Sequence, residues 1–125
     1  NLSIKAKNVK AAMIVFCGVR FMAETAKILS PDSTVLLPVP DAGCPMADMA
    51  DPIAVREYKK QHPDTLLVAY VNTTAATKRE VDLCCTSGNA EKIISALPAG
   101  QKIMFLPDAN LGSNVSGKNG YSAVK

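Results

Sequence analysis

The sequence predicts an α/β fold in which helices cover both faces of a parallel β-sheet, a three-layer αβα architecture. Short continuous apolar runs with β-branched members recur along the chain, and such runs are typical of strands buried on both faces of a parallel sheet. Amphipathic segments with capping residues separate these runs. Because strands alternate with helices, the pattern favours a parallel sheet wrapped by helices.

The apolar runs predict five strands, at residues 12–19, 34–38, 65–71, 81–85 and 102–106. Cys17 continues the first run, so we expect it to be a structural thiol in a buried strand. Cys84 and Cys85 are adjacent on a predicted strand and therefore point to opposite faces of the sheet. We expect at least one of the two to lie in the core, and we interpret both as structural.

Between these strands, capping residues and apolar periodicity predict helices at residues 2–9, 20–29, 51–61 and 87–97. Asp51 followed by Pro52 is a typical pair for the N-cap and the first turn of a helix. Ser87 is the predicted start of the last helix. The pattern predicts one incomplete α/β region at residues 1–115 and a polar tail at 116–125. The segment from 112 onward is Gly- and Asn-rich and has no period, so we expect the tail to be disordered.

Charge and cysteine content exclude several classes of function. The 14 basic and 11 acidic residues are scattered without a run of like charge, which argues against nucleic-acid binding. No apolar stretch approaches the roughly 18 residues that span a bilayer, and no leader pattern is present, so we expect a cytoplasmic protein without a membrane partner. The four cysteines lack the spacing of a zinc ribbon or a CxxC redox motif.

Polar side chains follow the predicted strands, where ligands of parallel α/β sheets usually bind. Cys44 lies in a loop after the second strand, Tyr70 and Asn72 follow the third, and Ser87 follows the fourth. Asp108 and Asn110 follow the fifth. Each has an ordinary structural alternative: Ser87 as a helix N-cap, Tyr70 as a buried tyrosine and Asn72 as a turn residue. The residues alone favour these alternatives, whereas the loop position of Cys44 favours a ligand or a nucleophile.

Five ordered segments nevertheless resemble quinolinate synthases in sequence and spacing, over about residues 2–115. They are FCGVRFMAETAKIL at 16–29, AGCPMA at 42–47, YVNT at 70–73, CTSGNA at 85–90 and PDANLG at 107–112. The resemblance implies a fold of three similar α/β domains, of which this chain would hold one and part of a neighbour.

The resemblance also implies a function in de novo NAD biosynthesis. Quinolinate synthases are transferases that condense iminoaspartate with dihydroxyacetone phosphate to quinolinate. They use a 4Fe-4S cluster that takes one cysteine from each domain. By this likeness Cys44 is a cluster ligand, the one of three present here. The same likeness implies that Tyr70 and Asn72 are catalytic residues that contact substrate, and that Ser87 binds an anionic substrate group.

The family's other two cluster cysteines and a histidine motif near its start have no match in this chain. We therefore expect the chain to be inactive alone and to act with the remainder of the enzyme as its partner. The alternative is a non-catalytic α/β module that binds a small anionic metabolite or a protein partner. An exposed apolar patch would be typical of that use.

Overall fold

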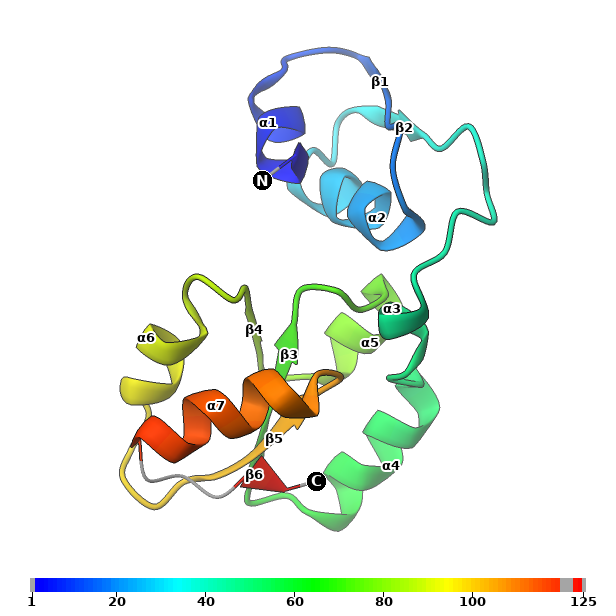
Figure 1. Ribbon diagram of the computed structural model, residues 1–125. Coiled ribbons are helices and arrows are strands. Elements are labelled where there is room, and N and C mark those ends of the chain that lie inside the picture. Colours follow the sequence, from blue (N-terminus) through cyan, green and yellow to red (C-terminus); the bar gives the residue numbers. More distant parts are fainter. Residues whose placement is uncertain (1, 120–122, 125) are drawn as a thin grey trace.

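The computed structural model describes residues 2–119 and 123–124, and the side chains of residues 2–117. The chain forms two lobes, each built on its own parallel sheet (Figure 1). The upper lobe contains α1 (Leu2–Asn8), β1 (Met13–Val15), α2 (Arg20–Leu29) and β2 (Thr34–Leu36). The family resemblance implies one domain and part of a neighbour, but the sequence indicated no boundary between them within residues 1–115.

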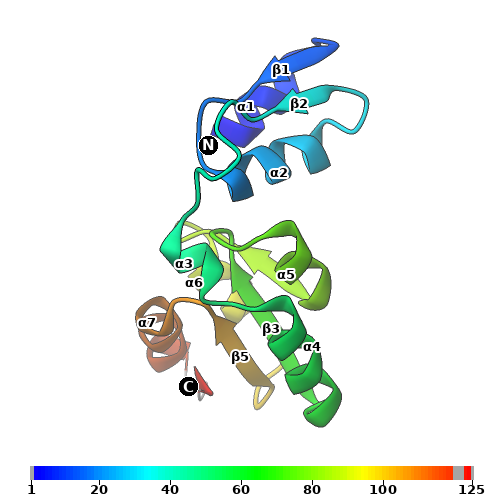
Figure 2. The same ribbon diagram turned by 90° about the vertical axis from the view of Figure 1, so that its right-hand side faces the viewer.

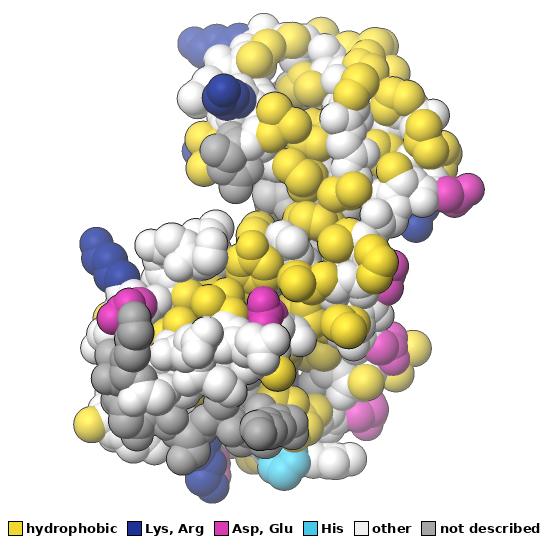
Figure 3. All heavy atoms as spheres, in the orientation of Figure 1, with side chains coloured by type: hydrophobic (Ala, Val, Ile, Leu, Met, Phe, Trp, Pro, Cys, Tyr) yellow, Lys and Arg dark blue, Asp and Glu magenta, His cyan; other side chains and the backbone are white. Residues whose placement is uncertain are grey.

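In the upper lobe, both helices pack on one face of the sheet. Strand β1 pairs with β2 in parallel, with Ile14 opposite Val35, and these two side chains pack against a core that contains Phe16. Met13 and Val15 point to the other face, where each is 59% exposed. Hydrophobic side chains are prominent on the visible face of this lobe (Figure 3).

The prediction that the first two strands are buried on both faces is therefore wrong. Successive side chains of a strand point to opposite faces of the sheet, and here the described helices cover only one of those faces. The strands are also shorter than predicted, because β1 ends at Val15 and β2 at Leu36.

The lower lobe begins with α3 (Pro45–Asp48) and α4 (Pro52–Gln61). It continues with β3 (Thr65–Tyr70), α5 (Ala75–Glu80), β4 (Leu83–Cys85), α6 (Ala90–Ser95), β5 (Lys102–Leu106), α7 (Ala109–Asn119) and β6 (Ala123–Val124). The strands lie in the order β4-β3-β5-β6 and all pair in parallel. Figure 2 shows α4 and α5 on one side of this sheet and α7 on the other.

Strand β3 is the centre of the lower lobe and is buried on both faces. Leu67 and Ala69 pack with Val55 of α4, whereas Val68 packs with Ile94 of α6 on the opposite face. Leu67, Val68 and Ala69 have no exposed surface. The three-layer α/β fold with a parallel sheet is thus confirmed.

Local capping explains where several helices begin. The side chain of Asp51 accepts hydrogen bonds from the backbone N–H groups of Ile53 (3.3 Å) and Ala54 (3.2 Å), as predicted for an N-cap. The helix predicted to open at Ser87 instead begins at Ala90, with Asn89 at its N-cap position. The side chain of Asn89 accepts hydrogen bonds from Thr86, which closes a turn before the helix.

The segment from residue 112, which we predicted to lack regular structure, belongs to α7 as far as Asn119. Asp108 starts this helix, because its Oδ1 accepts hydrogen bonds from the N–H groups of Asn110 (3.0 Å) and Leu111 (2.9 Å). The apolar face of the helix packs on β5 through Val115. Residues 120–122 and 125 of the predicted polar tail lie outside the described residues. None of the helices in the described part is long and apolar enough to cross a membrane.

Candidate active site

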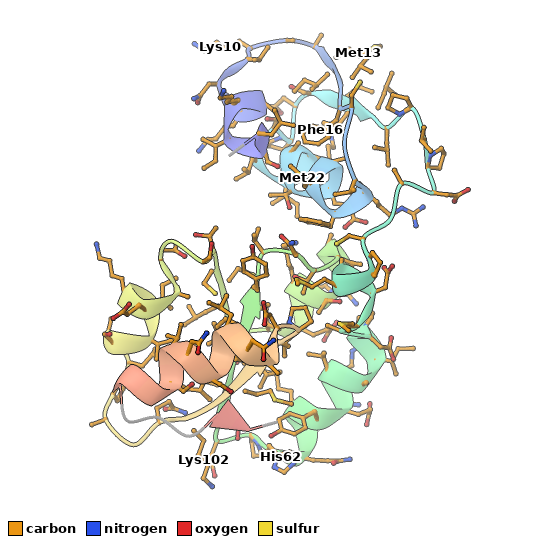
Figure 4. All side chains as sticks on the ribbon, viewed as in Figure 1. Lys10, Met13, Phe16, Met22, His62 and Lys102 are labelled. Carbon is orange, nitrogen blue, oxygen red and sulfur yellow. The ribbon has the colours of Figure 1, made fainter. Side chains whose placement is uncertain are left out.

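Three side chains predicted to bind substrate line one cavity of about 390 Å³ between the two lobes. They are Tyr70, Asn72 and Ser87. Residues of α1 and α2 form the opposite wall, including Met22, which is labelled in Figure 4. The full set of lining residues is Leu2, Ser3, Phe21, Met22, Thr25, Tyr70, Val71, Asn72, Thr86, Ser87 and Gly88.

The parallel pairing of β3 and β4 brings these three residues together. Tyr70 is the last residue of β3 and lies opposite Cys85, the last residue of β4. The N–H of Val71 donates to the carbonyl oxygen of Cys85 at 2.8 Å, so the two loops leave the sheet side by side. Asn72 and Ser87 each follow two residues later. Carboxyl ends of parallel strands meet at one edge, which is why separate segments converge here.

The three side chains differ in burial and in what holds them. Tyr70 is half-buried and packs against the apolar core of the lower lobe. Asn72 is half-buried, and the hydroxyl of the next residue, Thr73, donates to the carbonyl oxygen of Tyr70 at 3.1 Å. Ser87 is exposed and caps no described helix, so the simple N-cap alternative does not apply to it. Tyr70 and Asn72 are therefore held by the packing and hydrogen bonding around them, whereas Ser87 projects from a loop.

Cys44 lines a second cavity, of about 210 Å³. It occupies the N-cap position of α3, where its backbone is extended, and its side chain is half-buried. Arg20, Asp41 and Asp48 contribute charged groups to the same cavity. Phe21 lines both cavities, so the Cys44 cavity adjoins the cavity of Tyr70, Asn72 and Ser87 at this ring.

Comparison with known proteins identifies the family. The family model described as "Quinolinate synthetase A protein" matches residues 1–125. The chain belongs to this family.

Relatives of this quinolinate synthetase A family member are similar along most of its length. It is 56% identical to the quinolinate synthase of Pelobacter propionicus over 115 residues, which are 92% of this chain and 38% of that protein. It is 57% identical to the quinolinate synthase of Aquifex aeolicus, over 92% of this chain and 35% of that protein. Quinolinate synthase 2 of Methanosarcina acetivorans is 53% identical over 93% of this chain and 37% of its own length. The chain thus spans little more than a third of these relatives.

The remaining cysteines of this family member lie in different environments. Cys85 is buried, as expected for at least one of the adjacent pair, and burial raises its thiol pKa to about 11. Cys84 is exposed in this chain, and so is Cys17. The interpretation of Cys17 as a buried strand residue is wrong, because β1 ends two residues earlier and the described helices do not cover this position.

The described residues bring one candidate cluster ligand to the site. Among them, no three His, Cys, Asp or Glu side chains come together in an arrangement that could hold a metal ion. His62 is exposed at the far end of α4, away from both cavities, and its ring packs on Tyr58 with centroids 4.3 Å apart (Figure 4). The half-buried thiol of Cys44 in a cavity is suited to bind iron, but further ligands are required from elsewhere.

Two polar residues at the predicted sheet edge do not join the site. Asp108 uses its carboxylate to start α7, and Asn110 is an exposed residue of that helix. Conversely, the sequence analysis missed the residues of α1 and α2 that form the opposite wall, such as Ser3 and Thr25. The spacing of apolar residues at 2–9 and 20–29 predicted two amphipathic helices. No local signal showed that one helix face meets a loop about fifty residues away.

Proposed function

We propose that this chain is part of a quinolinate synthase, the enzyme that condenses iminoaspartate with dihydroxyacetone phosphate to quinolinate in de novo NAD biosynthesis. The quinolinate synthases to which it is more than 50% identical support this activity. One structural observation supports it further: Tyr70, Asn72 and Ser87, which the family resemblance implies as substrate contacts, line a single cavity that adjoins Cys44.

In this proposal the cavity between the lobes holds the anionic substrates. Its lining contains no charged side chain among the described residues, so neutral donors must bind the negative groups. The amide of Asn72 and the hydroxyls of Tyr70 and Ser87 can each donate a hydrogen bond to a carboxylate or phosphate oxygen. Tyr70 and Asn72 act at the reacting atoms, since both are held close to the sheet edge, and Ser87 binds a peripheral anionic group.

Cys44 supplies one thiolate to a 4Fe-4S cluster, and the remainder of the enzyme supplies the other ligands. When bound, such a cluster provides an iron without a protein ligand that acts as a Lewis acid on substrate oxygens. A reducing cytoplasm suits this role, and the four cysteines are free thiols in the structure. We therefore propose a cytoplasmic enzyme whose partners are its own remaining domains and two small anionic substrates.

The test uses the full-length protein that contains this chain, reconstituted without oxygen with iron and sulfide. Quinolinate formed from iminoaspartate and dihydroxyacetone phosphate is measured by chromatography, with bound iron and visible absorbance recorded alongside. We expect Cys44→Ser to lose the cluster and all activity, whereas the matched change Cys17→Ser retains both. Tyr70→Phe and Asn72→Ala should retain the cluster but lose most activity, because a donor at the reacting atoms contributes about 10²- to 10³-fold to the rate.

Equal loss of iron from the two serine variants would contradict the role of Cys44. A protein that binds phosphate or a dicarboxylate in the cavity but forms no quinolinate would favour the alternative of a non-catalytic binding module.

A further inference from the structure

A side-chain carboxylate of α2 joins the two lobes through a hydrogen bond. Oε2 of Glu24, on α2 of the upper lobe, accepts a hydrogen bond from the backbone N–H of Ala75 at 2.7 Å. Ala75 is the first residue of α5 in the lower lobe, and the two residues are 51 positions apart in the sequence. The Glu24 side chain is half-buried, so water competes for this bond less than at an open surface.

Lys78, one turn along α5, makes two further contacts at the same junction. Its ammonium group donates to the carbonyl oxygen of Thr73, and it lies over the ring of Phe21 with 5.5 Å between Nζ and the ring centroid. Phe21 and Glu24 are three residues apart and share one face of α2. Burial lowers the pKa of Lys78, and the charges of Cys84 and Glu24 act in the opposite direction.

These contacts reach the turn that carries the proposed catalytic residues. Thr73 directly follows Asn72, is fully buried, and donates its hydroxyl to the carbonyl oxygen of Tyr70 at 3.1 Å. Lys78 thus holds the backbone of the turn through the carbonyl oxygen of Thr73. Neither Glu24 nor Lys78 lines the cavity of Tyr70 and Asn72, so neither is placed to contact substrate there.

Helix α2 is tied to the Cys44 loop as well. The backbone N–H of Arg20, its first residue, donates to the carbonyl oxygen of Ala42 at 2.7 Å, two residues before Cys44. The same helix therefore contacts the loop of the proposed cluster ligand at its start and α5 through Glu24, one turn later.

We infer that Glu24 and Lys78 are positioning residues that set the spacing between Cys44 and the turn of Tyr70 and Asn72. We call their contacts to Ala75, Thr73 and Phe21 the interlobe lock. The inference rests on the proposed function of the two cavities. Without the lock, α2 and the Cys44 loop can shift relative to α5, although every cavity residue is still present.

The expected kinetic effect follows from the geometry. A misplacement of about 1 Å at a reacting centre can lower the rate about 10²-fold. Glu24→Ala removes the carboxylate that accepts the hydrogen bond of the Ala75 N–H and should lower kcat at least about tenfold. KM should change less, because Tyr70, Asn72 and Ser87 remain on the lower lobe.

The experiment compares variants of the full-length enzyme with its cluster bound. Glu24→Gln keeps an acceptor oxygen, Glu24→Ala does not, and Lys78→Met keeps the aliphatic stem over Phe21 without the donor. Glu57→Ala and Lys60→Met are matched controls, because these residues form an exposed pair on α4, 2.8 Å apart. Bound iron, kcat, KM and hydrogen exchange of the backbone of residues 70–78 are measured for each protein.

We expect Glu24→Ala and Lys78→Met to keep their iron, to exchange faster at residues 70–78 and to lose kcat. Glu24→Gln should lie within about threefold of the parent in kcat, since the neutral amide oxygen still accepts the bond. The controls should match the parent. If Glu24→Ala does not fold, Lys78→Met decides the question alone, because it leaves the Glu24 bond intact.

Parent-like exchange and kcat in both Glu24→Ala and Lys78→Met would overturn the interlobe lock. If Glu24→Gln lost as much kcat as Glu24→Ala, the effect of Glu24 could not be assigned to its hydrogen bond with Ala75. If the parent enzyme forms no quinolinate, the proposed function fails, and only hydrogen exchange can then test the interlobe lock. In that case, faster exchange of residues 70–78 in Glu24→Ala, together with parent-like exchange in Glu24→Gln, would support the interlobe lock.

Discussion

Gly112 in α7 offers a direct test of how tightly the helix packs on β5. A Cβ added at Gly112 would lie 2.9 Å from Cβ of Phe105 and 3.1 Å from its Cγ and Cδ1. Carbon atoms prefer separations of about 3.5–4.0 Å, so all three contacts would be too close. Cβ of Phe105 is attached directly to the strand backbone and cannot rotate away. Phe105 is also in the core cluster of the lower lobe, only 6% exposed.

Two opposing effects decide the outcome of Gly112→Ala. Alanine stabilises a helix interior by about 0.5–1 kcal/mol relative to glycine, whereas overpacking a core costs about 1–3 kcal/mol. The added Cβ and Cβ of Phe105 are both attached directly to the backbone, so neither can rotate away. We therefore expect the cost of overpacking to exceed the gain in helix propensity, and the free energy of unfolding to fall by about 1–2 kcal/mol. Gly117→Ala in the same helix meets nothing within 4 Å and should instead gain up to about 1 kcal/mol.

The assay is urea unfolding of both variants and the parent, followed by circular dichroism at fixed pH and salt. The variants differ only in position along one helix, so helix propensity cancels between them and the packing against Phe105 remains. The reasoning would be refuted by equal gains in stability at both positions, since that result would mean that β5 and α7 separate at no cost.

Two further predictions concern the lower lobe. The hydrogen bond from Arg56 lowers the pKa of Glu80 to about 2, so the pair contributes stability above pH 4.5, the ordinary pKa, and loses it as the pH falls from there toward about 2. Urea midpoints measured across this range should fall more steeply for the parent than for Glu80→Gln, and parallel curves would contradict the role of the pair. The buried hydroxyl of Thr77 donates to the carbonyl oxygen of Ala50 at 2.7 Å. Thr77→Val should cost about 1–3 kcal/mol in urea unfolding and Thr77→Ser less, because only valine leaves the carbonyl unpaired; the reverse order would exclude this explanation.

Features that depend on neighbouring residues could be predicted from the sequence. Helix α2 has the predicted bounds, and Asp51 caps α4 as its position before Pro52 indicates. Residues 65–71 and 81–85 were predicted to be strands, and β3 and β4 lie within them. Parallel pairing then requires the residues after the two strands to meet at one edge. The grouping of Tyr70, Asn72 and Ser87 was therefore accessible before the structure was known.

Other features were not accessible in this way. The apolar runs around Met13 and Leu36 predicted burial on both faces, yet burial depends on which elements pack against a strand and not on its composition. The turn closed by Asn89 delayed the start of α6 beyond Ser87, because a side-chain acceptor competed with the helix for the nearby backbone donors.

The sequence by itself determined the order of the first five strands and of α1, α2, α4 and α6, the family, and the edge of the sheet at which polar residues gather. Short-range periodicity, caps and hydrogen bonds within a few residues are sufficient for that. Only the tertiary structure decided that α1 and α2 form the second wall of the cavity, that Phe21 joins it to the cavity of Cys44, and that Glu24 reaches Ala75. Such contacts join residues far apart in the chain, and they depend on how two lobes pack, which no local pattern records.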